Sequence, residues 1–202
     1  MSMFEDQNFC WRETFLVMLE VANRPATSQL LEHLKKLKSP FEIKNQITNP
    51  RGFAETFSIL AFQDHAAIDF VYSEGENVVR EFSALADELE SHDISRKEKA
   101  LIAKARKYSA KIELLHFEQI YEKKAEKLHR PTPLKFPKYS SFIKNLHQEC
   151  RENEADTENS DSAEFLNPNA LIQVLKLVSR LTGGIAFDPA SGLMLGHGEK
   201  MS

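Results

Sequence analysis

The sequence predicts an α+β fold: a mostly antiparallel, twisted sheet, or two small sheets, with amphipathic helices packed on one face. Three observations lead to this prediction. Short apolar runs, many of them alternating with polar residues, indicate strands joined mostly by short connections. Between some of these runs lie segments whose apolar residues recur at helical spacing. The length of 202 residues and the 42% apolar content fit one domain, or two small domains in contact.

The first half of the chain alternates between strand and helix patterns. Its first strand is a nearly continuous apolar run, which is typical of a strand covered on both faces. Four leucines at helical spacing predict the first helix, and Pro40 stops it. The predicted elements, in order, are a strand over 15–21, a helix that ends before 39, a strand over 41–47, a β-hairpin over 53–72 and a helix that ends near 90.

In the second half, the clearest local signals lie at helix ends. Ser95 and Glu98 have the spacing of a capping box. Asn167 suits an N-cap, Pro168 the first helical position and Gly183 a left-handed C-cap. The predicted elements are a basic helix over 95–107, a strand over 110–118, a helix over 168–182 and a small hairpin over 185–195.

These elements suggest one folded unit with less ordered segments around it. Strand–helix–strand–strand describes both 15–62 and 110–195, which hints at a duplicated unit, although the residues do not align. The segment before the last helix is acidic and has too few large apolar groups to offset its ordering entropy. We expect a flexible lead-in over 1–12, an α+β domain over 13–148, an acidic mobile linker over 149–165, and a C-terminal helix and β-hairpin over 166–202 that pack back on the same domain.

The charge of the chain is sorted into blocks. Residues 1–94 carry 8 basic against 16 acidic residues, residues 95–144 carry 14 against 5, and residues 145–202 carry 4 against 9. The net charges are therefore −8, +9 and −5, within a total of −4. Such asymmetry indicates either a charged binding partner or pairing between oppositely charged segments of the same chain.

The basic block supports two interpretations. With its interspersed aromatic residues it could follow phosphates and stack bases, although the pI near 6.0 is low for a nucleic-acid-binding protein. Alternatively, the block is a solvated helix face that pairs with acidic segments of the same chain or of a second copy. The cations that would form either surface are Lys97, Lys99, Lys104, Arg106, Lys107, Lys111, Lys123, Lys124 and Arg130.

His116 and Glu118 form the most suggestive catalytic pattern. Residues i and i+2 of a strand point to the same side, so a carboxylate beside an imidazole could orient a base or hold a metal. His65 or the His92–Asp93 pair could add a third group. The structural alternative is that His116 is a half-buried sheet residue paired with a neighbour. Glu118 would then lie at the solvent-exposed end of the strand. Two ligands are too few to define a metal site.

Common enzyme and cofactor-binding motifs are absent from the sequence. The sequence has no phosphate-binding loop, dinucleotide fingerprint, CxxC, HExxH or GxSxG motif. Cys10 and Cys150 suit unpaired thiols in a reducing cytoplasm. We therefore expect a cytoplasmic, non-enzymatic module without cofactor, metal or membrane contact, which acts by protein–protein contact or self-association. The alternatives are nucleic-acid or anion binding through residues 95–144, and a metal-dependent or hydrolytic enzyme using His116 and Glu118.

Overall fold

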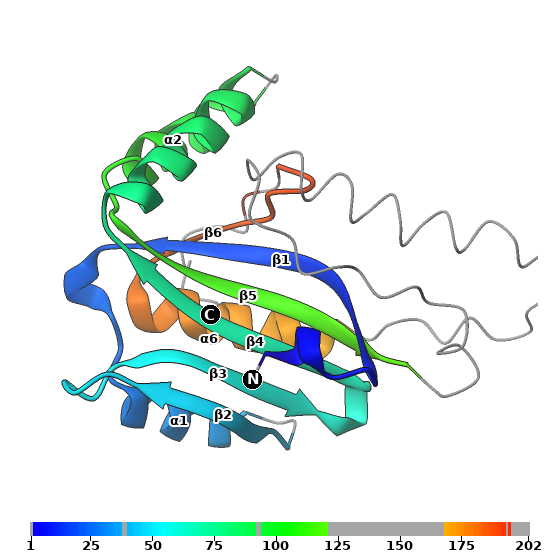
Figure 1. Ribbon diagram of the computed structural model, residues 1–202. Helices are drawn as coiled ribbons and strands as arrows, with labels where there is room; N and C mark the ends of the chain where they lie inside the picture. The colour runs from blue at the N-terminus through cyan, green and yellow to red at the C-terminus, as the bar shows by residue number, and fades with distance from the viewer. Residues whose placement is uncertain (1, 38–39, 92–93, 121–167, 193, 195–202) are drawn as a thin grey trace, which may run out of the picture.

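Six strands form one antiparallel sheet in the order β2-β3-β4-β5-β1-β6 (Figure 1). The computed structural model describes residues 2–37, 40–91, 94–120, 168–192 and 194. The strands are β1 (Phe9–Leu19), β2 (Glu42–Thr48), β3 (Ala54–Ala61), β4 (Ala66–Glu74), β5 (Ala110–Gln119) and β6 (Ile185–Phe187). The helices are α1 (Thr27–Lys35), α2 (Glu76–Glu90), α3 (Arg96–Ala105) and α6 (Asn169–Thr182).

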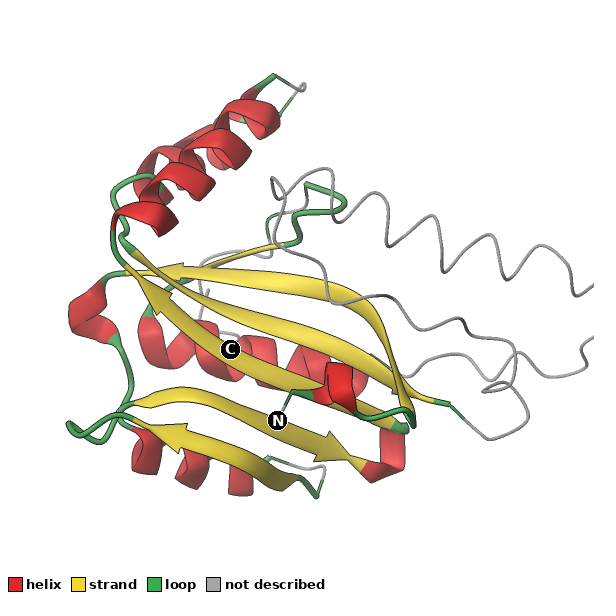
Figure 2. Ribbon diagram, in the orientation of Figure 1, coloured by secondary structure: helices red, strands yellow, loops and turns green. Residues whose placement is uncertain are grey.

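The predicted α+β class with a mostly antiparallel sheet is confirmed (Figure 2). The strands join one sheet, not two small ones, because β1 pairs with both β5 and β6 and so connects the N- and C-terminal parts of the chain. The suspected second strand–helix–strand–strand unit is incomplete in the described residues. There α6 is followed only by the short β6 and by a single bridge between Phe187 and Met194.

The larger core lies between one face of the sheet and helices α1 and α6, behind the sheet in Figure 1. Strand residues of one alternation set point into it, among them Val17, Phe57, Phe70 and Leu114. The apolar stripe of α6 and the leucines of α1 cover these side chains. We call this side the back face of the sheet and the opposite side the front face.

Helices α2 and α3 differ from the expected arrangement because they pack on the front face. Their core includes Leu16 and Met18 of β1 together with Ile185 and Phe187 of β6, which alternate with the back-face residues of the same strands. The near-continuous apolar run of β1 reflects this burial on both faces. We call the two helices the arm, because Figure 1 shows them projecting beyond the edge of the sheet that carries β6.

Residues 2–12, expected to be a flexible lead-in, instead form the short 3-10 turn η1 (Met3–Glu5) and the start of β1. Met3 and Trp11 are buried in a small front-face cluster with Phe117. Alternation statistics miss such a turn, because it has only one buried apolar residue of its own. The expected linker over 149–165 and much of the basic block lie outside the described residues.

Two of the three helix-end predictions that the described residues test are confirmed, and one is shifted by a residue. Ser95 and Glu98 form the capping box at the start of α3. Gly183 ends α6 in the left-handed conformation, with φ of 60°. Pro168 lies at the N-cap of α6, one position earlier than expected.

Among the described helices, none is both long and apolar enough to cross a membrane.

Candidate functional site

His116 and Glu118 lie on the same face of β5, but each is paired with a residue of β1. His116 Nδ1 is 3.0 Å from Glu13 Oε1, and Glu118 accepts hydrogen bonds from the Arg12 guanidinium, whose Nε lies 2.7 Å from Oε2. A β-bulge between Trp11 and Glu13 brings both β1 side chains to this face, since two residues there oppose one on β5. Both contacts between β1 and β5 are thus consequences of one bulge.

This arrangement leaves little of the expected catalytic pair. Glu118 is paired with the Arg12 guanidinium, so its carboxylate connects β5 to β1 and does not orient the His116 imidazole. His116 is completely buried, and its Nε2 has no hydrogen-bond partner. His65 is exposed directly before the start of β4, where its carbonyl oxygen accepts from the Gln119 amide, and His92–Asp93 lies outside the described residues. Within the described ranges, no three His, Cys, Asp or Glu side chains are grouped to hold a metal.

The nine predicted cations divide into three groups. Lys123, Lys124 and Arg130 lie outside the described residues. Arg106 and Lys111 are held by the protein's own acids: Arg106 donates to Asp87 and Glu90 at 2.6 and 3.1 Å, and Lys111 lies 2.7 Å from Glu81. Four remain exposed on or just after α3, namely Lys97, Lys99, Lys104 and Lys107. Within residues 95–120, the described part of the basic block, the exposed cations thus lie on or just after one helix, to which Arg96 adds a further one.

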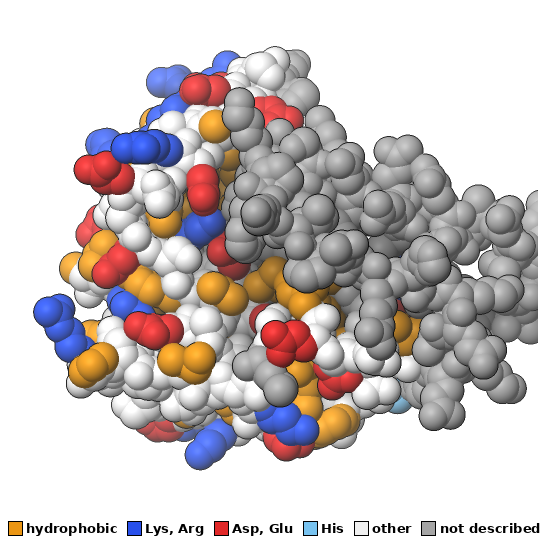
Figure 3. Space-filling model, viewed as in Figure 1, with side chains coloured by type: hydrophobic (Ala, Val, Ile, Leu, Met, Phe, Trp, Pro, Cys, Tyr) orange, Lys and Arg blue, Asp and Glu red, His pale blue; other side chains and the backbone are white. Residues whose placement is uncertain are grey.

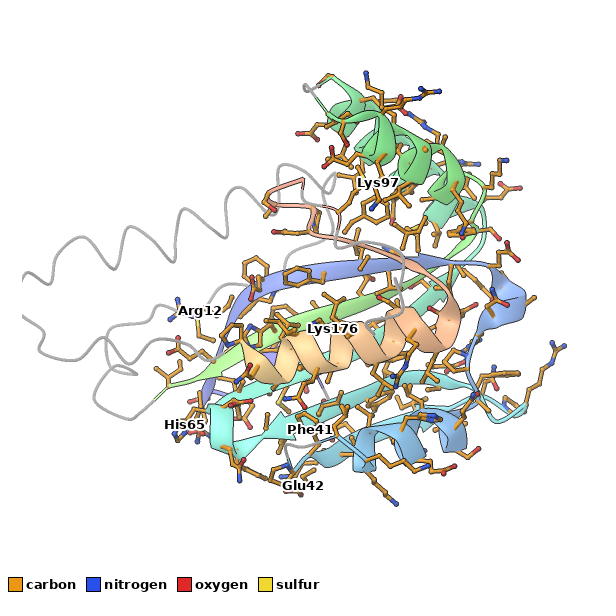
Figure 4. The ribbon with its side chains drawn as sticks, turned by 180° about the vertical axis from the view of Figure 1, so that it is seen from behind. Arg12, Phe41, Glu42, His65, Lys97 and Lys176 are labelled. Carbon is orange, nitrogen blue, oxygen red and sulfur yellow. The ribbon has the colours of Figure 1, made fainter. Side chains whose placement is uncertain are left out.

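The two helices of the arm carry opposite charges. Within α2 there are five acidic residues and one arginine, a net charge of −4. Within α3 there are four basic residues and one acid, Glu98, a net charge of +3, and Arg106 and Lys107 directly after the helix raise it to +5. Red and blue side chains both gather at the upper left of Figure 3, where Figure 1 places the arm. Figure 4 shows Lys97 on the arm and Arg12 and His65 toward the far end of the sheet, so the two candidate regions are separate.

A polar belt on the front face of the sheet was missed by sequence reasoning. It lies between the apolar cluster under η1 and the apolar cluster under the arm. Strand pairing sets Ser58 beside Asp69, and Val71 beside Glu113. The belt consists of Thr14, Thr56, Ser58, Asp69, Ser73, Lys111 and Glu113. Alternation marks these positions as facing away from the back core, but it cannot tell whether solvent or protein covers them.

Asp69 is the most buried carboxylate of the belt, with 4% of its surface exposed. Its Oδ2 accepts from Ser2 Oγ at 2.6 Å and from the Met3 amide at 2.9 Å, and its Oδ1 accepts from Ser58 Oγ at 2.6 Å. These three donors offset part of the cost of burying the charge. A pocket of about 110 Å³ opens beside them, lined by Ser2, Asn45, Thr56, Phe57, Ser58, Asp69, Phe70 and Val71.

At the other end of the belt, Lys111 bridges two acids between the sheet and the arm. Its Nζ lies 2.7 Å from Glu81 of α2 and 3.4 Å from Glu113 of β5. Burial raises the pKa of the Glu113 carboxyl, and the Glu81 charge adds to this, while Lys111 opposes it. The raised pKa means that desolvation outweighs the attraction of the lysine for this carboxylate.

The raised pKa predicts how Glu113→Gln changes stability with pH. A carboxyl whose pKa is higher in the folded state stabilises the fold below its unfolded pKa and loses that contribution as pH rises through the folded pKa. Glutamine stays neutral throughout. The free energy of unfolding of the variant, relative to the wild type, should therefore rise between about pH 4 and pH 8. Urea unfolding at both ends of this range measures it.

The control for this experiment is Glu55→Gln, which changes an exposed carboxylate on β3. We expect its relative stability to change little over the same range. If Glu113→Gln instead became relatively less stable as pH rises, the Lys111–Glu113 attraction would outweigh desolvation and our interpretation would be wrong.

No protein-family model matches the chain, and no curated protein or solved structure matches it.

Proposed function

We propose that this chain is a protein-interaction module that self-associates through the arm, with α2 of one copy facing α3 of another. The observation that carries the proposal is the opposite net charge of two neighbouring helices, −4 on α2 and +3 on α3, which becomes +5 with Arg106 and Lys107 directly after α3. A two-fold axis would place the acidic helix of each copy against the basic helix of the other, so every favourable contact occurs twice.

The hydrophobic pattern of the arm supports this role. The buried side of each helix is used within the chain, where Phe82 and Ile102 pack with β1 and β6. The partly buried Leu85, Ile94 and Leu101 add apolar surface at the margin of that cluster. A second copy would therefore meet a mostly charged surface with a few apolar side chains, which suits a weak, salt-sensitive contact.

The described part of the basic block fits nucleic acid less well. Binding of single strands combines cations with exposed aromatic rings on which bases stack. The aromatic residues of the arm and of the turn directly after it, Phe82 and Tyr108, are only 3% and 5% exposed. The exposed cations are also mostly lysines, since the guanidinium of Arg106 is engaged by Asp87 and Glu90. The enzyme alternative is weakened because Arg12 occupies Glu118.

Sedimentation of the full chain at low and high salt tests the proposal. We expect a monomer–dimer equilibrium at low salt that shifts toward monomer at high salt. Reversing two exposed lysines in Lys99→Glu/Lys107→Glu should weaken dimerisation by about tenfold or more. Exposed pairs contribute roughly 0.2–1 kcal/mol each, and each substitution counts twice in a two-fold dimer.

A charge exchange separates this contact from general effects of charge. The complementary variant Glu76→Lys/Glu88→Lys should also dimerise weakly by itself, whereas an equal mixture of the two variants should restore association. The matched control is Lys35→Glu/Lys176→Glu, which makes the same change in net charge on exposed positions of α1 and α6. Figure 4 shows Lys176 on α6, away from the arm.

Three results would contradict the proposal. A strict monomer at high protein concentration and low salt would exclude self-association. Failure of the mixed variants to associate, or equal weakening by the Lys35→Glu/Lys176→Glu control, would exclude the arm as the contact. Retardation of a nucleic-acid probe that is lost in Lys99→Glu/Lys107→Glu would instead favour the phosphate-binding alternative. The predicted cytoplasmic location is compatible with the proposal and stays a prediction.

A further inference from the structure

We infer that the front-face pocket beside Asp69 binds a primary ammonium group. The pocket lies where the bulged part of β2 meets β3 and β4, and it combines a buried carboxylate with hydroxyl and amide side chains. Asp69 and Ser58 are 4% and 2% exposed, so both are held rigidly within the protein. This site is independent of the arm and of self-association.

The hydrogen bonds in the pocket determine which chemistry it can recognise. Ser2 and Ser58 each have a single hydroxyl hydrogen, and both donate it to Asp69, at 2.6 Å in each case. Each oxygen also accepts one bond within the protein, Ser2 Oγ from the Phe4 amide at 3.4 Å and Ser58 Oγ from the Asn45 side chain, so one lone pair on each is left as an acceptor. Asn45 Nδ2 lies 3.5 Å from Ser58 Oγ, which leaves the Asn45 amide oxygen as another acceptor. A ligand that brings N–H donors therefore fits this wall better than an anion does.

Charge favours the same ligand. Asp69 makes no ion pair with a Lys, Arg or His among the described residues, although it is nearly fully buried. Lys111, the cation of the same belt, is already shared by Glu81 and Glu113. A carboxylate accepts up to about four hydrogen bonds, and Asp69 receives three from the protein. One acceptor site and one negative charge remain for a bound cation.

The volume limits the size of the group. The pocket of about 110 Å³ has room for an ammonium nitrogen with a short carbon chain. The apolar side chain of this front-face lining is Val71, which suits the methylene next to the nitrogen, because the rings of Phe57 and Phe70 point into the back-face core. The same oxygens could take a hard monovalent ion, so the experiment must separate N–H donors from charge alone.

The test is a titration of the full chain with methylammonium chloride, followed by the thermal midpoint and by amide NMR shifts. Potassium chloride and tetramethylammonium chloride at equal ionic strength are the controls, because the first has charge without N–H groups and the second an ammonium charge without N–H groups. We expect saturable stabilisation by methylammonium that exceeds both, with shifts concentrated at residues of β3 and β4 that line the pocket.

Two variants locate the site. Thr56→Val removes one hydroxyl from the lining without touching the hydrogen bonds of Asp69, and it should weaken binding by about 3- to 10-fold. The matched control is Thr48→Val on β2, an exposed position outside the lining, which should bind as the wild type does. Asp69→Asn should abolish the titration, provided that its circular dichroism shows a folded chain.

Equal effects of methylammonium and tetramethylammonium, or no saturable effect, would overturn the inference, as would wild-type binding by Thr56→Val. A saturable effect of potassium equal to that of methylammonium would show a site for charge and not for N–H donors. Because Lys99→Glu/Lys107→Glu leaves the pocket intact, it should retain methylammonium binding even if it no longer dimerises.

Discussion

Phe70→Ala is expected to destabilise the protein by about 3–5 kcal/mol, which is a large part of the stability of a typical domain. Phe70 is 2% exposed, and its ring stacks on Phe57 with centroids 4.5 Å apart and an interplanar angle of 17°. Both rings belong to the back-face core, which is close-packed, so the remaining side chains cannot collapse fully into the space that alanine leaves.

Urea unfolding of wild type and variant measures this loss. The control is Phe62→Ala, which removes the same group from a position that is 54% exposed and should change stability by less than about 0.5 kcal/mol. A loss below about 1.5 kcal/mol for Phe70→Ala would mean that the sheet and α6 are not packed as closely as the structure has them.

Gly184→Ala is the second substitution with a large expected effect. A Cβ at this position would lie 2.6 Å from Val17 Cγ1, 2.8 Å from the Met18 carbonyl oxygen and 2.8 Å from Thr182 Oγ1. Met18 cannot move away easily, because its strand is paired on both sides, with β5 and with β6. We expect a loss of about 2–3 kcal/mol or more, since overpacking against backbone forces the strands apart.

The neighbouring Gly183 supplies the control. It has a φ of 60°, but nothing lies within 4 Å of its would-be Cβ. Gly183→Ala should therefore cost only the left-handed conformation, about 1–2 kcal/mol. Urea unfolding ranks the two variants, and protection of the Met18 and Ile185 amides from hydrogen exchange reports whether β6 detaches. If Gly183→Ala lowered the free energy of unfolding more than Gly184→Ala, we would conclude that the close approach of β6 to β1 does not hold the C-terminal strand in place.

Local pattern was a good guide to the elements of this chain. The leucines of α1, the stripe of α2 and the Ser95–Glu98 capping box each depend on residues within one or two turns, and the structure contains all three. The hairpin of β3 and β4 likewise follows from alternation on either side of a short polar break. Such signals can be read from sequence because their energetics involve neighbours only.

The candidate sites depended on contacts that a sequence does not display. His116 and Glu118 do share a face, as alternation requires, but Glu13 and Arg12 reach them from a strand about a hundred residues away because of a bulge. The alternating polar residues of β3 and β4 were consistent with a solvent-exposed face of the sheet. The turn η1 covers part of that face and converts Asp69 into a buried carboxylate.

The sequence by itself determined the α+β class, the positions of the helices to within a few residues and the opposite charges of α2 and α3. The tertiary structure alone decided that α2 and α3 pack on the front face, that Arg106 and Lys111 are neutralised, and that a polar belt lies between two apolar clusters. The physical reason is the separation along the chain over which each kind of interaction acts. Periodicity and capping act over a few residues, whereas burial and ion pairing depend on which distant segments the sheet brings together.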